Sequence, residues 1–203
     1  FMYRMTVNIP EPVSVRQMPV TKVNGREATT FSDTLSVEEP LEIGICYEAP
    51  AGPVSKNISV TMRTPGNDIE LALGFLFTEG ILSSYEQVKH VRHADTDSAS
   101  NRVEVSFAED YRPQLAQADR NFYTTSSCGV CGKGSIESIK TVSPFRDMDR
   151  PLAALSASML YELPQKLRAA QNNFSATGGI HASGLFSTDD GSLLLLREDV
   201  GRH

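Results

Sequence analysis

Long hydrophobic runs and clusters of basic residues are both missing from this chain of 203 residues. No wholly apolar run is longer than the four residues from Leu193 to Leu196, whereas a membrane-spanning helix needs roughly 20. Nineteen Lys and Arg against 25 Asp and Glu give a net charge of −6, and binding to phosphates or anionic lipids requires clustered positive charge. The sequence therefore predicts neither a membrane protein nor a general nucleic-acid binder.

Cysteine is also scarce, with three in the whole chain. A small, odd number argues against a disulfide framework and for a reducing compartment, where thiols bind metals or react. The first twelve residues hold no apolar stretch of about 7–15 residues, which a secretory signal would need. We therefore expect a cytoplasmic protein whose chemistry involves its cysteines.

The hydrophobic residues, 40% of the chain, are arranged in strand and helix patterns. Alternation at 41–47 and 57–62 predicts an antiparallel hairpin, and 85–92 with 102–107 predicts a second antiparallel pair. An almost wholly apolar helix, expected to be buried, begins after Asn67 or Asp68 and ends at Gly80. The two pairs and the helix indicate a packed core.

The ends of the chain give weaker patterns. Residues 1–19 hold three prolines and predict an extended arm. A helix is expected from about Ser156 to 170, kinked or interrupted at Pro164. Residues 178–186 and 192–196 flank a turn and predict either a hairpin or the start of a βαβ unit.

Together these elements predict an α/β or α+β fold with a three-layer core, a mixed set of strands and a smaller β-rich N-terminal part. We place the boundary so that residues 1–66 form the N-terminal arm and β-rich part. Residues 67–203 then form the core that carries the cysteine-rich loop.

The most unusual segment is the glycine-rich loop around Cys128-Gly-Val-Cys131. Two thiols at this spacing can bind one metal, form a small disulfide or share a transferred sulfur atom. A structural zinc site normally needs four ligands, and the remaining cysteine and histidines show no matching pair. Glycines let the backbone swing, which suits a thiol that passes sulfur between partners more than a rigid redox dithiol. Lys133 and the lack of acidic residues from 120 to 136 would favour the thiolate.

A zinc-deaminase interpretation remains as an alternative, because Cys46-Tyr47-Glu48 followed by a later Cys-x-x-Cys imitates that family's pattern. The spacing is long, however, and Cys46 lies in an alternating strand pattern, where a lone cysteine is more often a small core residue. We favour the core interpretation for Cys46.

A second group of candidate residues lies near the end of the chain. Gly178, Gly179 and His181 come first, and Arg197, Arg202 and His203 follow with Glu198 and Asp199 between them. The glycines would allow close backbone approach, and the His and Arg side chains could donate to phosphate oxygens. Alternatively, the glycines only form a turn, and the two acidic residues pair with the arginines.

Four segments together resemble the formate dehydrogenase accessory sulfurtransferase family, FdhD. They are RTPGNDIELALGFLFTEGIL at 63–82, TSSCGVCGK at 125–133, ATGGIHASGLF at 176–186 and REDVGRH at 197–203. The resemblance implies a sulfur carrier that accepts persulfide sulfur from a cysteine desulfurase. It would deliver this sulfur to the molybdenum cofactor, in its bis(guanine dinucleotide) form, before the cofactor enters formate dehydrogenase.

The resemblance also implies roles for individual residues. Cys128 matches the persulfide-carrying cysteine, and Cys131 would assist transfer. Gly178, Gly179, His181, Arg197, Asp199, Arg202 and His203 would face the cofactor, which is bound as a substrate, and no permanent metal is expected. The implied fold is a cytidine-deaminase-like core in a homodimer. Family members continue beyond Gly-Arg-His, so part of the implied cofactor site lies outside these residues. Two other functions stay open: a non-catalytic chaperone for the molybdenum cofactor or a guanine nucleotide, and a zinc-dependent deaminase-like hydrolase.

Overall fold

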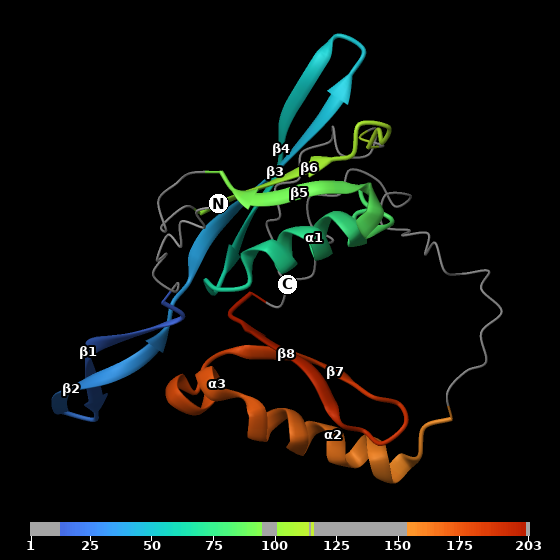
Figure 1. Cartoon of the computed structure of the whole chain (residues 1–203). Helices are drawn as coiled ribbons and strands as arrows, with labels where there is room; N and C mark the ends of the chain where they lie inside the picture. Colours follow the sequence, from blue (N-terminus) through green and yellow to red (C-terminus); the bar gives the residue numbers. More distant parts are fainter. Residues whose placement is uncertain (1–12, 95–100, 114, 116–153, 202–203) are drawn as a thin grey trace, which may run out of the picture.

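The computed structural model describes residues 13–94, 101–113, 115 and 154–201. Within them the chain is a mixed α/β protein built on one four-stranded sheet and two separate two-stranded sheets. Figure 1 shows the four-stranded sheet with its helix above the second helical part, and the first hairpin extending to one side. In the part of the chain described, no helix is long and apolar enough to cross a bilayer.

The central sheet contains β3 (Glu39–Ala49), β4 (Gly52–Arg63), β5 (Val88–His93) and β6 (Arg102–Phe107) in the order β4-β3-β6-β5. β3 and β6 run parallel, and the other neighbours are antiparallel. The two expected antiparallel pairs are therefore confirmed, and a parallel contact joins them into one mixed sheet. A 3₁₀ turn over Tyr85–Gln87 replaces the start of the strand expected at 85.

One face of this sheet forms the core with helix α1 (Asp68–Thr78). Alternate residues of β3, such as Ile43 and Ile45, are fully buried with Ala72 and Leu76 of the helix. The expected helix is confirmed after Asn67, and it is buried on the side that faces the sheet. Phe77 is 40% exposed, because a helix packed on one sheet buries only the stripe that faces it.

The second part of the described chain is helix α2 (Ala157–Ala170), helix α3 (Asn172–Thr177) and the hairpin of β7 (His181–Phe186) with β8 (Leu193–Asp199). β7 and β8 pair antiparallel, so the hairpin alternative is confirmed and the βαβ alternative is wrong. Ser156 caps α2 by accepting from the amide of Met159 at 3.1 Å. The helix continues without interruption through Pro164, so an interruption there is not found.

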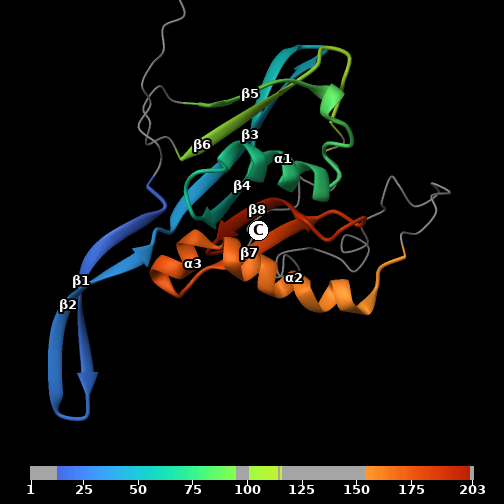
Figure 2. The same ribbon diagram turned by 60° about the horizontal axis from the view of Figure 1, so that its bottom comes forward.

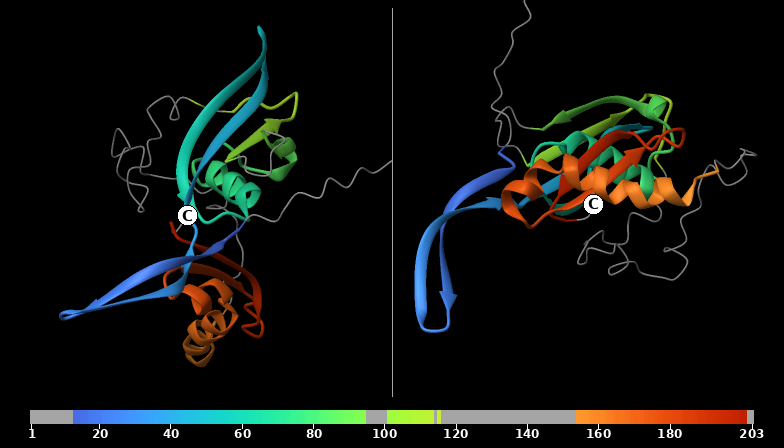
Figure 3. Two further views of the ribbon diagram at one scale, coloured as in Figure 1. Left: turned by 90° about the vertical axis from the view of Figure 1, so that its left-hand side faces the viewer. Right: turned by 90° about the horizontal axis from the view of Figure 1, so that it is seen from below.

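The N-terminal part contains a long hairpin that the sequence analysis missed. β1 (Val15–Asn24) pairs with β2 (Glu27–Ser36) over ten residue pairs. The extended arm predicted for residues 1–19 is thus a paired strand from Val15 onward, and residues 1–12 lie outside the described structure. Figure 2 and Figure 3 show this hairpin, in blue, reaching away from the rest of the molecule.

The boundary proposed after residue 66 falls in the turn between β4 and α1. Strands from both sides of it share the central sheet, and α1 packs on strands from both sides. The mixed α/β class is confirmed, whereas the cytidine-deaminase-like, three-layer arrangement stays a prediction.

Candidate functional site

The cysteine loop predicted to carry the chemistry, with Cys128 and Cys131, lies outside the described residues. The third cysteine, Cys46, is a free thiol in β3 and is partly exposed. Its neighbours Ile45 and Tyr47 point to the core side, so alternation along the strand turns Cys46 to the opposite face. Its prediction as a core residue is therefore wrong: it lies opposite Ser55 and Ser106 on the polar face of the sheet. Among the described residues, no group of three or more potential metal ligands exists.

Five of the seven residues expected to face the cofactor are described, and all lie at or near the β7–β8 hairpin. Gly178 ends α3 in a left-handed conformation with φ of 69°, which a side chain would strain. His181 begins β7 directly opposite Asp199, and Arg197 lies opposite Ser183. Arg202 and His203 lie outside the described residues, directly after Gly201.

Alternation along β8 sends consecutive side chains in opposite directions. Arg197 reaches Glu70 on α1, with Nη2 donating to Oε1 at 2.7 Å and Nε donating to Oε2. This hydrogen bond lowers the pKa of Glu70 below its ordinary range and raises the pKa of Arg197. Arg197 therefore fixes β8 to the first turn of α1 instead of pointing freely into solvent.

Glu198 points the other way and holds the start of α3. Its two carboxylate oxygens accept from the amides of Asn173 and Phe174, each at 2.9 Å. These amides belong to a helix N-terminus, where a negative charge is favourable. The prediction that Glu198 and Asp199 pair with the arginines is wrong for Arg197, whose carboxylate partner is Glu70.

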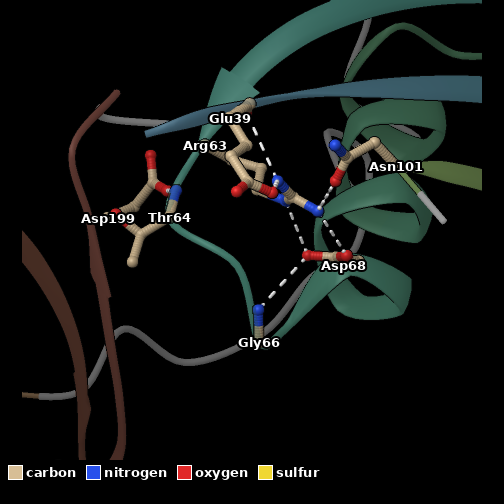
Figure 4. Close-up of polar contacts among 7 residues, drawn as sticks. All are labelled: Glu39, Arg63, Thr64, Gly66, Asp68, Asn101 and Asp199. Atoms are coloured by element: carbon tan, nitrogen blue, oxygen red, sulfur yellow. Dashed lines mark hydrogen bonds and ion pairs between the residues drawn. The ribbon is translucent and has the colours of Figure 1, made fainter. Parts of the chain in front are cut away.

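Asp199 fixes the end of β8 to the turn after β4. Its Oδ1 accepts from the amide of Thr64 at 2.6 Å, and its Oδ2 accepts from the amide of Gly201 at 2.7 Å. In return, the amide of Val200 donates to the hydroxyl of Thr64 at 3.2 Å. Figure 4 shows Asp199 and Thr64 side by side, with Thr64 directly after the end of β4.

The turn at 64–67 is itself held by a buried arginine, Arg63. Arg63 is 2% exposed, and its Nε and Nη2 donate to the two carboxylate oxygens of Asp68 at 2.9 and 2.8 Å. Nη2 also donates to Asn101 at 2.8 Å, and Nη1 lies 3.7 Å from the Glu39 carboxylate. Figure 4 shows these groups converging on the guanidinium from β3, from α1 and from the start of β6.

A pocket of about 370 Å³ lies where these pieces meet. It is lined by Ser14, residues 64–67, Asn173 and residues 196–198. The lining is polar, and the charged groups beside it are paired within the protein: Arg197 with Glu70 and Glu198 with the amides of α3. The described arrangement thus positions the end of β8, and with it the segment that leads to Arg202 and His203.

Comparison with known proteins relates this chain to a protein family. The chain is 46% identical over 190 residues to the "Sulfur carrier protein FdhD" of Mycolicibacterium paratuberculosis, covering 91% of this chain and 66% of that protein. The protein of the same name from Streptomyces coelicolor is 40% identical over 189 residues, covering 91% and 64%. The chain therefore spans slightly less than two thirds of the length of these relatives.

A similar fold occurs in the crystal structure of a protein from Desulfotalea psychrophila named as a formate dehydrogenase accessory protein. The TM-score is 0.61 at 17% sequence identity, over 94% of this chain and 65% of the other. At this identity the likeness concerns the fold alone. The two chains thus share a mixed α/β fold.

Residues 36–203 match the FdhD/NarQ family. The chain belongs to this family, as the resemblance of its four segments implied.

Proposed function

We propose that this chain acts in a sulfur carrier, which takes sulfur from a cysteine desulfurase and transfers it to the molybdenum cofactor destined for formate dehydrogenase. The observation that carries the proposal is family membership over residues 36–203, together with relatives named as sulfur carriers. The cysteines at 128 and 131 supply the chemistry that such a carrier needs.

Loading is a thiol exchange without net oxidation. The thiolate of Cys128 attacks the terminal sulfur of the desulfurase persulfide, and the desulfurase cysteine leaves as a thiolate. The bond formed is the sulfur–sulfur bond of a Cys128 persulfide, and the bond broken is the corresponding bond on the donor. Glycines around the loop would let this persulfide reach two partners in turn.

Delivery gives Cys131 a distinct role. Attack of its thiolate on the inner sulfur of the Cys128 persulfide forms a Cys128–Cys131 disulfide and releases the outer sulfur at the level of hydrosulfide. The two thiols supply the two electrons, and a thiol reductant restores them afterwards. Loading thus requires Cys128 alone, whereas release by this route requires both cysteines.

The contacts at the end of β8 would position the part of the site that binds the substrate. Asp199 and Arg197 fix the strand from which Gly201 leads to Arg202 and His203. We propose that these last two side chains meet the phosphates of the substrate, with Gly178, Gly179 and His181 nearby. Arg197 would join them only by leaving Glu70. The deaminase-like core, the homodimer and the cytoplasmic location belong to the same proposal.

The proposal is tested by formate dehydrogenase activity in a bacterial strain that lacks its own sulfur carrier and is supplied with this chain. Cys128→Ala should abolish the activity that the unchanged chain restores, and Cys131→Ala should reduce it strongly. Cys46→Ser is the matched control and should leave it unchanged, because Cys46 lies in β3 on the central sheet. Activity that persists in Cys128→Ala would instead favour a cofactor-binding chaperone without sulfur transfer.

A further inference from the structure

Thr64, directly after the end of β4, is bonded to the end of β8 at two points. Its amide donates to Oδ1 of Asp199 at 2.6 Å, and its hydroxyl accepts from the amide of Val200 at 3.2 Å. The partners lie 135 and 136 positions later in the sequence. Thr64 is buried, at 7% exposed, so a lost bond here leaves a polar group short of a partner. These two bonds therefore fix the path of the chain as it leaves β8.

Asp199 extends this constraint to the next residues. Its second carboxylate oxygen, Oδ2, accepts from the amide of Gly201 at 2.7 Å. Both oxygens of Asp199 are thus bonded to backbone amides. A carboxylate only accepts hydrogen bonds and repels phosphate oxygens. Asp199 is therefore suited to holding the backbone around Gly201, and unsuited to direct contact with a phosphate.

The turn that carries Thr64 is held from its other side by the buried pair of Arg63 and Asp68. The guanidinium donates to both carboxylate oxygens of Asp68 at 2.9 and 2.8 Å. Asp68 also accepts from the amide of Gly66 at 3.4 Å, within the turn. Figure 4 shows the chain passing from Thr64 through Gly66 to α1 beside this pair. The amide and hydroxyl of Thr64 are therefore presented to β8 from a turn that is itself fixed.

We infer that Thr64 is a positioning residue for substrate binding. Its hydroxyl fixes the backbone at Val200, and thereby the direction in which the chain continues to Arg202 and His203. The inference rests on the proposed function, which assigns the phosphates of the substrate to these two side chains. An arginine binds phosphate through donors in a fixed geometry, so a displaced backbone weakens the contact. Thr64 acts only through these residues and takes no part in the loading of Cys128.

Three substitutions separate the hydroxyl of Thr64 from the fold. Thr64→Val keeps the shape and the amide but removes the hydroxyl, so the amide of Val200 loses its acceptor. Thr64→Ser keeps the hydroxyl. Thr61→Val is the matched control, because it makes the same change three residues earlier, in β4, at a residue that is 5% exposed. Among the described residues, the hydroxyl of Thr61 has no hydrogen-bond partner.

Calorimetric titration of the 203-residue chain with guanosine diphosphate tests the inference. This probe carries the guanine and diphosphate groups of the proposed substrate. Thr64→Val should raise the Kd about fivefold or more, which corresponds to about 1 kcal/mol, the typical value of one hydrogen bond. Thr64→Ser and Thr61→Val should bind within about twofold of the unchanged chain.

The salt dependence of binding separates positioning from a general loss of structure. The difference between Thr64→Val and the unchanged chain should shrink as salt rises from about 0.05 to 0.5 M, because salt screens the phosphate contacts that the variant has lost. A destabilised fold would give a difference that does not depend on salt. Sulfur loading of Cys128, measured by intact-protein mass, should be the same in all three variants and the unchanged chain.

Several results would overturn the inference. These are unchanged binding in Thr64→Val, equal losses in Thr64→Val and Thr61→Val, no recovery in Thr64→Ser, a salt-independent loss, or a loss of sulfur loading in Thr64→Val. A chain that loads sulfur but binds no guanosine diphosphate would refute the inference and leave the sulfur-carrier proposal standing. A chain that binds the probe in the Thr64-dependent way but loads no sulfur would support the inference and refute the sulfur carrier.

Discussion

Removing Asp68 should destabilise the fold far more than its place beside a surface turn suggests. Arg63 and Asp68 are 2% and 6% exposed and form a two-point ion pair at 2.8 and 2.9 Å. Asp68→Ala leaves a buried guanidinium with Asn101 and the more distant Glu39 as its remaining partners. Breaking a buried pair from one side costs about 3–5 kcal/mol.

Urea unfolding followed by far-ultraviolet circular dichroism measures this cost. With a slope of about 2 kcal/mol per molar urea, the midpoint should fall by about 1.5–2.5 M. Glu39→Gln is the matched control: Glu39 lies 3.7 Å from the guanidinium and its side chain is 40% exposed, so the change should cost less than about 1 kcal/mol. Replacing both charges together, as Arg63→Met with Asp68→Leu, should cost less than Asp68→Ala alone. A loss below about 1 kcal/mol for Asp68→Ala would refute the role given to this pair.

Three further substitutions test contacts around the core, between α1 and β8, and within the β7–β8 hairpin. Tyr111→Phe removes a hydrogen bond of 2.7 Å to the carbonyl of Ile81 and should cost about 1 kcal/mol. Burial raises the pKa of Tyr111, so wild-type stability should decline as the pH rises above about 10, where the unfolded tyrosine ionises first; a Tyr111→Phe profile with the same decline would contradict this. Glu70→Gln should cost less than about 1 kcal/mol at neutral pH because the pair with Arg197 is solvent-exposed. Since Arg197 lowers the pKa of Glu70, the difference from wild type should be full above about pH 4.3 and vanish as the pH falls through the lowered value; a difference that stays constant down to pH 2 would be inconsistent. Gly184→Ala would bring a methyl group 2.7 Å from Leu167 and 2.9 Å from Phe186, and thermal unfolding should show a loss of about 1–2 kcal/mol, whereas an unchanged midpoint would mean that these side chains move freely aside.

The central sheet and α1 were predictable because their patterns come from burial. Alternate residues of β3 enter the core, and the apolar stripe of α1 covers them. The extent of burial was not predictable in the same way. A helix such as LALGFLF looks apolar all round, but a single sheet covers only one side of it.

The β1–β2 hairpin shows where a local signal was overlooked. Gly25-Arg26 forms its two-residue turn, and Gly25 has φ of 64°; a glycine at the first position of such a turn is a hairpin signal. Pro19 inside β1 obscured it, since proline is rare within paired strands. Because this sheet has only two strands, β1 needs pairing on one side alone, which permits a proline.

The contacts that join β8 to α1 and to the turn after β4 could be predicted only in part. The sequence marked Arg197 and Asp199, but their partners Glu70 and Thr64 lie more than a hundred residues earlier. Arg63 was missed because a charged residue at a strand end is usually exposed. Asp68, five residues later across a Pro-Gly turn, was the one signal that could have suggested a buried pair.

The central claim, that this chain carries sulfur on Cys128, is tested most directly by intact-protein mass spectrometry after incubation with a cysteine desulfurase and free cysteine. The account predicts a reducible gain of about 32 Da per sulfur in the unchanged chain and in Cys131→Ala and Cys46→Ser. Cys128→Ala should gain none. Sulfur that still adds to Cys128→Ala, or no added sulfur on the unchanged chain, would contradict the claim.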